Sequence, residues 1–440
     1  MNGHPLENPF TSAFRTSTLV LTGIVLAFSL VFLPTLMVLA TVLGIVLLLL
    51  VFHRPVSALG IVLAYMPIHF LVVILGQFFG LPHMTLVSAC TKEVVLLLLI
   101  LILWQRNGFK PTTPDWFLLG CLTLALLRTA VGGKLIGLRD DFSLLIPYVA
   151  GRVTVITSAQ ERLWAKCAVW IAAVLSVAGM VEVFYLGPGP RKVIFTAFSG
   201  DTDLGDSFRA SGFEGIRAAS TMVSPLDFGA LCMVGVIIWW VYVRNPLPVA
   251  FVCGGLLCSL TRSAWVGTAL AIPILALRLG QSKRVMRYAL LALAAFVLAI
   301  PILDIGDYLS STRSGQDISA ESHSASLVQG LEYVGTNPFG SGAGSVGPRA
   351  VQENYTGFNI ESTYLTLAAN YGVLAGGCFL AFFVSALRRT WNNRTQLGYL
   401  ATAILMGIGA MMMFLPIHVD LRLDCWVWFP VGLSIRANPV

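Results

Sequence analysis

The sequence predicts an all-α polytopic membrane protein, and three observations support this fold class. First, 57% of the 440 residues are hydrophobic and 11% are charged, whereas soluble domains carry about 25% charged residues. Second, the mean hydropathy is +0.82. Third, the apolar runs are unbroken and leucine-rich, as in residues 43–52, whereas membrane barrels show alternating segments of about ten residues. A chain this poor in charge can be covered by lipid if helices satisfy its backbone.

The individual spans follow from the rule that about 20 apolar residues cross a bilayer as a helix. The first apolar run, residues 19–52, is long enough for a helical hairpin that turns near Pro34. Further spans are expected at residues 56–79, 86–104, 115–131, 141–158, 163–186, 221–243, 246–260, 263–278, 288–304, 362–387, 395–416 and 420–436. Because a few of these are short, the expected total is about 11–14 transmembrane helices.

Lysines and arginines beside the spans predict the orientation, because cytoplasmic loops carry the excess of these residues. Most of them, such as Arg106 with Lys110 and Arg162 with Lys166, fall on one side. Both termini are then cytoplasmic, and the two long polar segments lie together on the opposite, outer face. The predicted regions are N-terminal membrane helices (1–186), a first outer loop (187–220), central membrane helices (221–304), a large outer loop (305–361) and C-terminal membrane helices (362–440).

Functional residues are expected in the two outer loops, since loops held by a rigid scaffold carry most binding sites. In the large loop, an apolar spacing typical of one face of a short amphipathic helix is formed by Leu327, Val328, Leu331 and Val334. Residues 337–347 follow with the sequence NPFGSGAGSVG. This segment is too rich in glycine for a helix, and we expect it to offer free backbone donors.

Basic residues on the outer side are unexpected, because the positive-inside tendency depletes them there. Those that remain are Arg139, Arg191, Lys192, Arg209, Arg217, Arg262, Arg313, Arg349 and Arg422. Arg217 and Arg262 lie at or just before the outer end of a predicted span, where a guanidinium can fork onto phosphate oxygens. Any one of these basic residues is explained equally well as a side chain that extends from a helix end to the membrane–water interface. The set together indicates a bound anion.

Glu361 is the second unexpected charge, where the large outer loop enters an apolar span. One interpretation is structural, because a carboxylate at a helix N-terminus is stabilised by the helix dipole. The other is a general base, tuned by partial burial and nearby cations. Ser362 or Asn359 would cap the helix in either case. Further candidates for substrate contacts are Arg139, Arg349, His323 and Asp317.

Motifs for nucleotides and metals are absent from the sequence. It contains no phosphate-binding Gly-Lys loop, no nucleophile elbow and no zinc motif. ATP-driven transport by this chain therefore has no support, and no cofactor is expected.

Four segments, taken in order, resemble motifs of one family. Residues 217–225 (RAASTMVSP) resemble the arginine-bearing segment before a span in the O-antigen ligase and Wzy-type polymerase superfamily, and residues 261–265 (TRSAW) resemble its Ser-Arg helix start. Residues 337–344 (NPFGSGAG) and 361–372 (ESTYLTLAANYG) are similar to its glycine-rich stretch and to the opening of a late helix. Order and spacing agree over roughly residues 210–380.

The resemblance implies a bacterial inner-membrane glycosyltransferase of the GT-C type that works on the periplasmic face without nucleotide or metal. Its donor would be a saccharide linked to undecaprenyl diphosphate, and its acceptor a second saccharide. Arg217 and Arg262 would neutralise the departing diphosphate. Glu361 would take the proton of the acceptor hydroxyl, and attack opposite the leaving group would invert the anomeric centre.

One departure from the family pattern bears on the reaction. Members that join O-antigen to lipid A-core usually carry histidine at the position of Glu361. This difference and the glycine-rich loop favour a polymerase of O-antigen or exopolysaccharide units, working with a chain-length regulator, and ligation to lipid A-core is the alternative. A transporter or flippase of lipid-linked sugars, and an assembly subunit whose loops dock partners, are alternatives from other classes. Transporters place charges at mid-membrane, whereas the charges here gather at outer helix ends.

Overall fold

The computed structural model describes residues 46, 49–78, 84–132, 134–189, 216–281, 283, 318–347, 360–415 and 420–436. In these residues the chain is helical, with connecting turns and no β-strand. The predicted all-α class is confirmed. The chain divides into two compact units, residues 1–61 and 62–440, and every candidate residue that is described lies in the second. The predicted span 288–304 and most of 19–52 lie outside the described residues.

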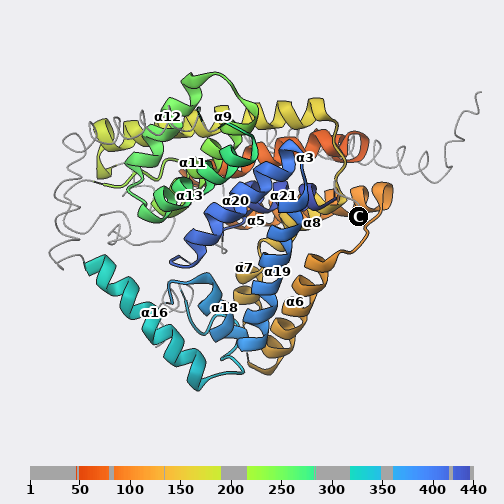
Figure 1. The fold of residues 1–440 in the computed structure, drawn as a ribbon, viewed down its shortest axis with the longest axis vertical. Helices are drawn as coiled ribbons and strands as arrows, with labels where there is room; N and C mark the ends of the chain where they lie inside the picture. The colour runs from red at the N-terminus through yellow and green to blue at the C-terminus, as the bar shows by residue number, and fades with distance from the viewer. Residues whose placement is uncertain are drawn as a thin grey trace, which may run out of the picture. The chain divides into compact units, whose positions relative to one another are not determined.

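The helices follow one another along the chain as labelled in Figure 1. They are α3 (Pro55–Tyr65), η1 (Met66–Ile68), α4 (His69–Phe78), α5 (Met84–Asn107), α6 (Thr113–Gly132), α7 (Leu135–Asp141), α8 (Leu145–Val153), α9 (Ser158–Val181), the π-helical η2 (Glu182–Leu186), α11 (Pro225–Tyr242), α12 (Pro246–Cys258), α13 (Arg262–Arg278), α16 (Ile318–Thr336), α18 (Thr363–Tyr371), α19 (Val373–Asn392), α20 (Gln396–Met412) and α21 (Leu421–Arg436).

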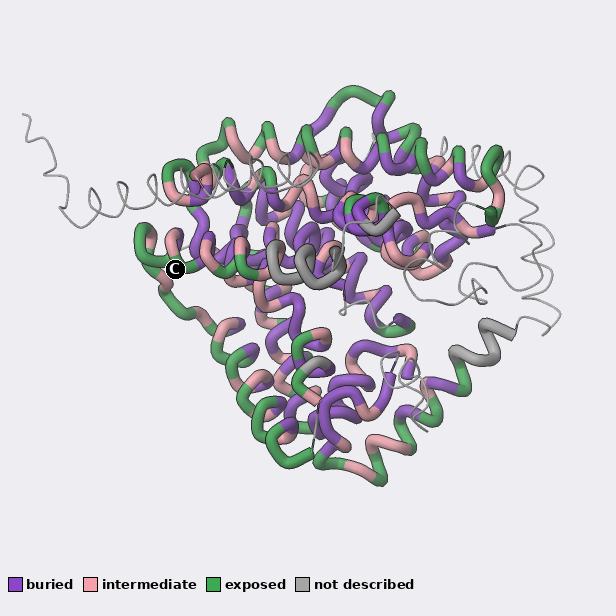
Figure 2. The backbone as a smooth tube through the Cα atoms, turned by 180° about the vertical axis from the view of Figure 1, so that it is seen from behind, coloured by how far each residue is buried: buried purple, intermediate pink, exposed green. Residues whose placement is uncertain are grey.

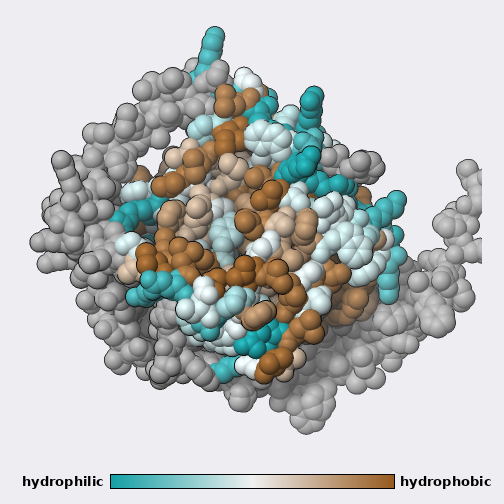
Figure 3. All heavy atoms as spheres, turned by 60° about the horizontal axis from the view of Figure 1, so that its bottom comes forward, coloured by the Kyte–Doolittle hydropathy of each residue, from teal (hydrophilic) through white to brown (hydrophobic). Residues whose placement is uncertain are grey.

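Several of these helices are built to face lipid. Five described segments are long and apolar enough to cross a membrane, namely Pro55–Gly76, Thr113–Gly132, Ser158–Leu186, Pro225–Tyr242 and Val373–Asn392. Their outward faces carry exposed apolar side chains, for example Leu127 at 62% and Val174 at 64% exposure. Figure 3 shows one face of the molecule on which hydrophobic side chains gather. The chain is therefore a polytopic membrane protein, and a total of 11–14 spans stays a prediction.

Helices α11 and α21 form the centre of the second unit. Nearly all residues of both are buried, including Trp239 and Trp428, and the buried residues concentrate in the interior in Figure 2. Helix α21 packs against α8, α20 against α13, α19 against α6, and α12 against α9. Glycines allow the closest of these approaches, as small residues do in membrane bundles. A Cβ at Gly432 would lie 2.2 Å from the carbonyl oxygen of Tyr148.

The prediction of a single span over residues 141–158 is wrong. Helix α7 ends at Asp141, α8 covers only Leu145–Val153, and α9 begins at Ser158. A nine-residue helix rises about 14 Å, well short of a hydrocarbon core of about 30 Å. The hydropathy of a short helix buried in protein resembles that of a spanning helix, which is why the sequence misled.

The short amphipathic helix of the large loop is confirmed as α16, but only part of its predicted apolar face packs inward: Leu327 and Val334 are partly buried, and Val334 packs against Val346, Ile360 and Ala369. Ser326 and Gly330 are buried, whereas Val328 and Leu331 are 57% and 61% exposed. A Cβ at Gly330 would lie 3.3 Å from the side chain of Ile360. Close approach of the helix backbone therefore decides which face is buried, and small residues allow it.

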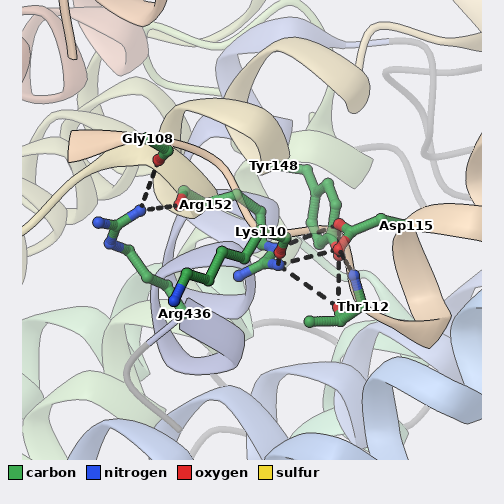
Figure 4. Close-up of polar contacts among 7 residues, drawn as sticks. All are labelled: Gly108, Lys110, Thr112, Asp115, Tyr148, Arg152 and Arg436. Carbon is green, nitrogen blue, oxygen red and sulfur yellow. Dashed lines mark hydrogen bonds and ion pairs between the residues drawn. The ribbon is translucent and has the colours of Figure 1, made fainter. Parts of the chain in front are cut away.

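A buried ion pair joins α6 to α8 at the end predicted to be cytoplasmic (Figure 4). Arg152 Nη2 lies 2.9 Å from Asp115 Oδ2, with side-chain exposures of 3% and 8%. Tyr148 donates to the other carboxylate oxygen over 2.8 Å. Arg436, the last residue of α21, donates to the carbonyl oxygens of Gly108 and Arg152 over 3.1 and 2.8 Å. In these contacts the polar atoms of the cluster bond to one another and to the protein backbone, so we assign the cluster a structural role.

Candidate active site

The turn between α12 and α13 places the first candidate arginine. Helix α12 ends at Cys258, and Leu260 adopts a left-handed backbone conformation with φ of 48°, which reverses the chain. The indole N–H of Trp265 donates to the carbonyl oxygen of Leu256 over 2.9 Å and ties the two helices together. Arg262 is the first residue of α13 and is partly buried.

Arg217 lies on the same turn, although it is far from Arg262 in the sequence. Its Nε donates to the carbonyl oxygen of Ser259 over 3.1 Å, and its Nη2 donates to Thr261 Oγ1 over 3.1 Å. The hydroxyl of Thr261 donates in turn to the carbonyl oxygen of Pro225 over 3.0 Å. The segment before α11 is thus fastened to the start of α13. The structure brings the two predicted arginines to one place, and we call it the arginine turn (Arg217, Ser259–Arg262).

Glu182 holds the other side of the Arg217 segment. Its Oε2 accepts the backbone N–H groups of Ala219 and Ser220 over 3.1 and 2.8 Å. Ser220 itself has a left-handed φ of 53°, and its hydroxyl donates to the carbonyl oxygen of Leu175 over 2.7 Å. Sequence reasoning did not single out Glu182. An acid at the end of a long apolar span was the signal, because buried carboxylates need donors.

Glu361 lies immediately before the N-cap of α18 and is partly buried. Its backbone N–H donates to Ser326 Oγ on α16 over 2.9 Å. Ser362 occupies the N-cap position, but its hydroxyl reaches the carbonyl oxygen of Met412 at 3.5 Å instead of capping the helix. Thr363 Oγ1 donates to the carbonyl oxygen of Leu415 over 2.9 Å. The expected cap by Ser362 is therefore wrong, and the start of α18 is fastened to the end of α20.

The packing of α13 on α20 puts the arginine turn and Glu361 at the same end of this helix pair. Near the start of α13, a Cβ at Gly267 would lie 2.8 Å from the carbonyl oxygen of Gly407, near the end of α20. At the end of α13, the guanidinium of Arg278 lies 4.7 Å from the ring centre of Tyr399, near the start of α20. The helices are therefore antiparallel. The start of α13, with Arg262, shares an end with the residues that hold α18.

The glycine-rich segment packs against the end of α18. As predicted, this segment is not helical. Several of its backbone N–H groups, however, already donate hydrogen bonds. The N–H of Ser341 donates to the carbonyl oxygen of Ala369 over 2.9 Å, and the N–H of Gly342 to that of Asn370 over 2.8 Å. The side-chain oxygen of Asn370 accepts the N–H of Val346 over 3.1 Å. The expectation of free donors is wrong for these residues, because the segment supports α18.

The other candidates for substrate contacts are Arg139, His323, Asp317 and Arg349. Arg139 at the end of α7 is 47% exposed and forms an ion pair with Glu93 on α5. The backbone of His323 belongs to α16, and its side chain is outside what the structure describes. Also outside the described residues are Arg191, Lys192, Arg209, Arg313, Asp317, Arg349 and Asn359.

A second charged group, which sequence reasoning did not assemble, lies at the start of α21. Asp420 Oδ1 accepts the backbone N–H and the Nε of Arg422 over 2.9 and 2.7 Å. The guanidinium of Arg422 lies 5.5 Å from the ring centre of Phe70. The charge of Asp227, in the first turn of α11, acts on both. The sequence singled out Arg422 but not its partner Asp420 within the predicted span 420–436, because hydropathy averages over isolated charges.

A comparison with known protein families tests the resemblance that the motifs suggested. The segment that contains the start of α13, the glycine-rich segment and Glu361 is the part of the chain that matches. Residues 247–380 match the O-antigen ligase family. The resemblance is thereby confirmed for the three motif segments within this range, 261–265, 337–344 and 361–372, whereas residues 217–225 lie outside it.

The O-antigen ligase match covers α12, α13, α16, α18 and the first part of α19. It includes Arg262 and Glu361, but Arg217, Asp420 and Arg422 lie outside it. The match supports a function of the O-antigen ligase or polymerase type in a multi-pass membrane protein. A comparison with the curated proteins finds no match.

Proposed function

We propose that this chain is a glycosyltransferase of the bacterial inner membrane that polymerises lipid-linked saccharide units of a surface polysaccharide on the periplasmic face. The donor is a saccharide linked to undecaprenyl diphosphate, and the acceptor is a second saccharide. One observation carries this proposal. Arg217 is hydrogen-bonded to the turn that begins with Ser259 and ends at Arg262, at the end of the α13–α20 pair to which the Glu361 segment is fastened.

The arginine turn suits a diphosphate. Helix α12 has 13 residues and α13 has 17, which correspond to rises of about 20 and 26 Å. Both are shorter than a hydrocarbon core of about 30 Å, so a turn between two helices that start and end at the cytoplasmic interface lies recessed from the outer surface. Charge interactions are stronger in such a partly desolvated place. Two guanidinium groups there stabilise the negative charge that develops on the leaving diphosphate.

Glu361 is the general base of the proposed reaction. Its carboxylate accepts the proton of the acceptor hydroxyl as the oxygen attacks the anomeric carbon. The bond from that carbon to the diphosphate oxygen breaks, and the diphosphate leaves as an anion without an added proton. Attack from the face opposite the leaving group inverts the anomeric centre. The reaction requires neither a nucleotide nor a metal.

The acceptor distinguishes the two candidate reactions, polymerisation of repeat units and ligation to lipid A-core. Glutamate at position 361, where lipid A-core ligases usually carry histidine, supports polymerisation of O-antigen or exopolysaccharide units, and a chain-length regulator is the expected partner. Ligation to lipid A-core is the second candidate, supported by the description of the matching family. The products separate them, because a ligase adds one glycan to lipid A-core and a polymerase yields a ladder of repeat units.

The test uses the full chain reconstituted in proteoliposomes. The substrate is lipid-linked repeat units extracted from cells that lack this protein. We expect Arg217→Ala and Arg262→Ala to reduce the rate of polymer formation by about 100-fold or more, because each removes a donor that stabilises the developing charge. Lysine at either position should restore only part of the rate, because the fork of the guanidinium is lost. Arg244→Ala, in the connection before α12 at its opposite end, is the control.

Two outcomes contradict the proposal. Full activity of both alanine variants removes the arginine turn from the reaction. Movement of the lipid-linked saccharide across the vesicle membrane without any new glycosidic bond identifies a flippase instead.

A further inference from the structure

Asp420 presents a buried carboxylate oxygen that the described part of the chain does not satisfy. The side chain of Asp420 is 7% exposed. Its Oδ1 accepts both hydrogen bonds from Arg422, whereas its Oδ2 has no hydrogen-bond partner among the described residues. A buried carboxylate oxygen without a donor is unfavourable and uncommon in folded proteins. Such an atom points to a ligand or an ordered water.

Lys92 is the complementary group. It lies on α5, partly buried, and the charges of Asp420, Arg422, Glu93 and Arg139 act on it. Arg139 is paired with Glu93 and Arg422 with Asp420. No carboxylate of the described residues lies within ion-pair distance of Lys92. An ammonium carries three donors, and the charges of Lys92 and Asp420 act on each other.

These groups form a polar track from the surface toward the arginine turn. It begins at Arg139 and Glu93, which are 47% and 24% exposed, and continues through Lys92 to Asp420 with Arg422. Asp227 comes next, because its charge acts on that pair. Asp227 accepts the hydroxyl of Ser224 over 2.7 Å, and the neighbouring carbonyl oxygen of Pro225 accepts the hydroxyl of Thr261. The polar track (Arg139, Glu93, Lys92, Asp420, Arg422, Asp227) therefore ends beside the arginine turn.

The charges of the polar track select its ligand. Arg139 and Arg422 are already paired with carboxylates, and Asp227 balances the charge of Lys92, so the track offers a phosphate group no surplus of positive charge. A mixture of carboxylate acceptors and an ammonium donor suits hydroxyl groups, which both donate and accept. No group of three metal-binding side chains is found among the described residues. A polyhydroxylated ligand fits this chemistry.

We infer that the polar track binds the saccharide portion of a substrate, with Asp420 Oδ2 accepting from a sugar hydroxyl and Lys92 donating to another. The inference rests on the proposed function and divides the substrate between two sites. The diphosphate binds at the arginine turn, and the sugars extend from it along the polar track toward the surface at Arg139.

The experiment measures binding to the purified full chain in nanodiscs. Three probes are used: undecaprenyl diphosphate alone, the same lipid carrying the repeat unit, and a lipid-free oligosaccharide released from the polymer. Lys92→Met and Asp420→Asn should weaken binding of at least one saccharide probe by about tenfold, the loss of one hydrogen bond to a charged group. Both variants should bind undecaprenyl diphosphate alone as the wild type does. Arg217→Ala should weaken both lipid probes.

The two saccharide probes identify the substrate. Weaker binding of the lipid-linked repeat unit only assigns the polar track to the donor, and weaker binding of the lipid-free oligosaccharide only assigns it to the acceptor. Asp115→Asn is the matched control, because Asp115 is as buried as Asp420 and holds an arginine at the opposite end of the helices. It should lower the melting temperature and leave binding of all three probes unchanged.

The inference is overturned if Lys92→Met and Asp420→Asn bind both saccharide probes like the wild type, whatever their melting temperatures. It is also overturned if the wild type binds the repeat unit no better than undecaprenyl diphosphate alone and does not bind the oligosaccharide. Failure of the proposed function looks different: Arg217→Ala then binds undecaprenyl diphosphate like the wild type, while the effects at Lys92 and Asp420 persist.

Discussion

Arg217 Nη2 donates a hydrogen bond of 3.1 Å to the hydroxyl oxygen of Thr261, the residue directly before Arg262. The same hydroxyl donates to the carbonyl oxygen of Pro225, so one threonine joins the segment before α11 to the start of α13. Gly229 makes room for this contact, since a Cβ there would lie 2.8 Å from Thr261 Cβ. The position of Arg217 therefore depends on a side chain that carries no charge.

Thr261→Val removes this junction at nearly constant volume. We expect polymer formation to fall by about tenfold and stability by about 1–2 kcal/mol, because Arg217 loses an acceptor and Pro225 loses a donor. Rate in proteoliposomes and melting temperature in detergent are the measurements. Thr268→Val is the matched control on the same helix, because among the described residues the hydroxyl of Thr268 bonds only to Ala264 of its own helix. Equal losses in the two variants would show that the junction does not position Arg217.

Glu361→Gln tests the general base. The substitution keeps the shape of the side chain and removes its ability to take a proton, so polymer formation should drop by about 10²–10⁴-fold with normal protein level and membrane insertion. Polymer from cells is compared by gel electrophoresis. Glu332→Gln, on the exposed face of α16, should behave as the wild type. Polymer of normal amount and chain length from Glu361→Gln would remove Glu361 from the chemistry.

Gly340→Ala tests the support of α18 by the glycine-rich segment. Gly340 has a φ of 76°, and a Cβ there would lie 2.5 Å from the backbone nitrogen of Gly372. The strain and the collision together should lower the stability by more than about 1 kcal/mol. Gly335→Ala, in α16 with open space around it, should be neutral or stabilising by up to about 1 kcal/mol. Thermal unfolding in detergent distinguishes the two, and an unchanged melting temperature for Gly340→Ala contradicts the packing.

Arg152→Met tests the structural cluster of Figure 4. It leaves the carboxylate of Asp115 buried without its partner, and the expected loss of stability is about 3–5 kcal/mol. The double variant Arg152→Met with Asp115→Leu should recover most of this loss, because two apolar side chains replace the buried pair. The folded double variant should still form polymer. Loss of polymer with restored stability would give the cluster a direct role in function.

The sequence predicted the general architecture because the cost of exposing polar groups to lipid acts on every residue separately. Low charge and long leucine-rich runs are sufficient to predict an all-α membrane protein. The out-of-place charges Arg217, Arg262 and Glu361 were recognisable for the same reason, and the order of the motifs pointed to the family that residues 247–380 match.

Only the tertiary structure decided which of these residues meet. Arg217 and Thr261 are joined by hydrogen bonds between segments far apart in the chain, and Asp420 is satisfied on one oxygen and not on the other. The packing of α8 against α21 and the buried face of α16 depend on close backbone approach at Gly432 and Gly330. Hydropathy and local spacing describe whether a residue faces lipid, protein or water. They do not specify its partner, because helix pairing depends on side-chain shape and hydrogen bonds between distant segments.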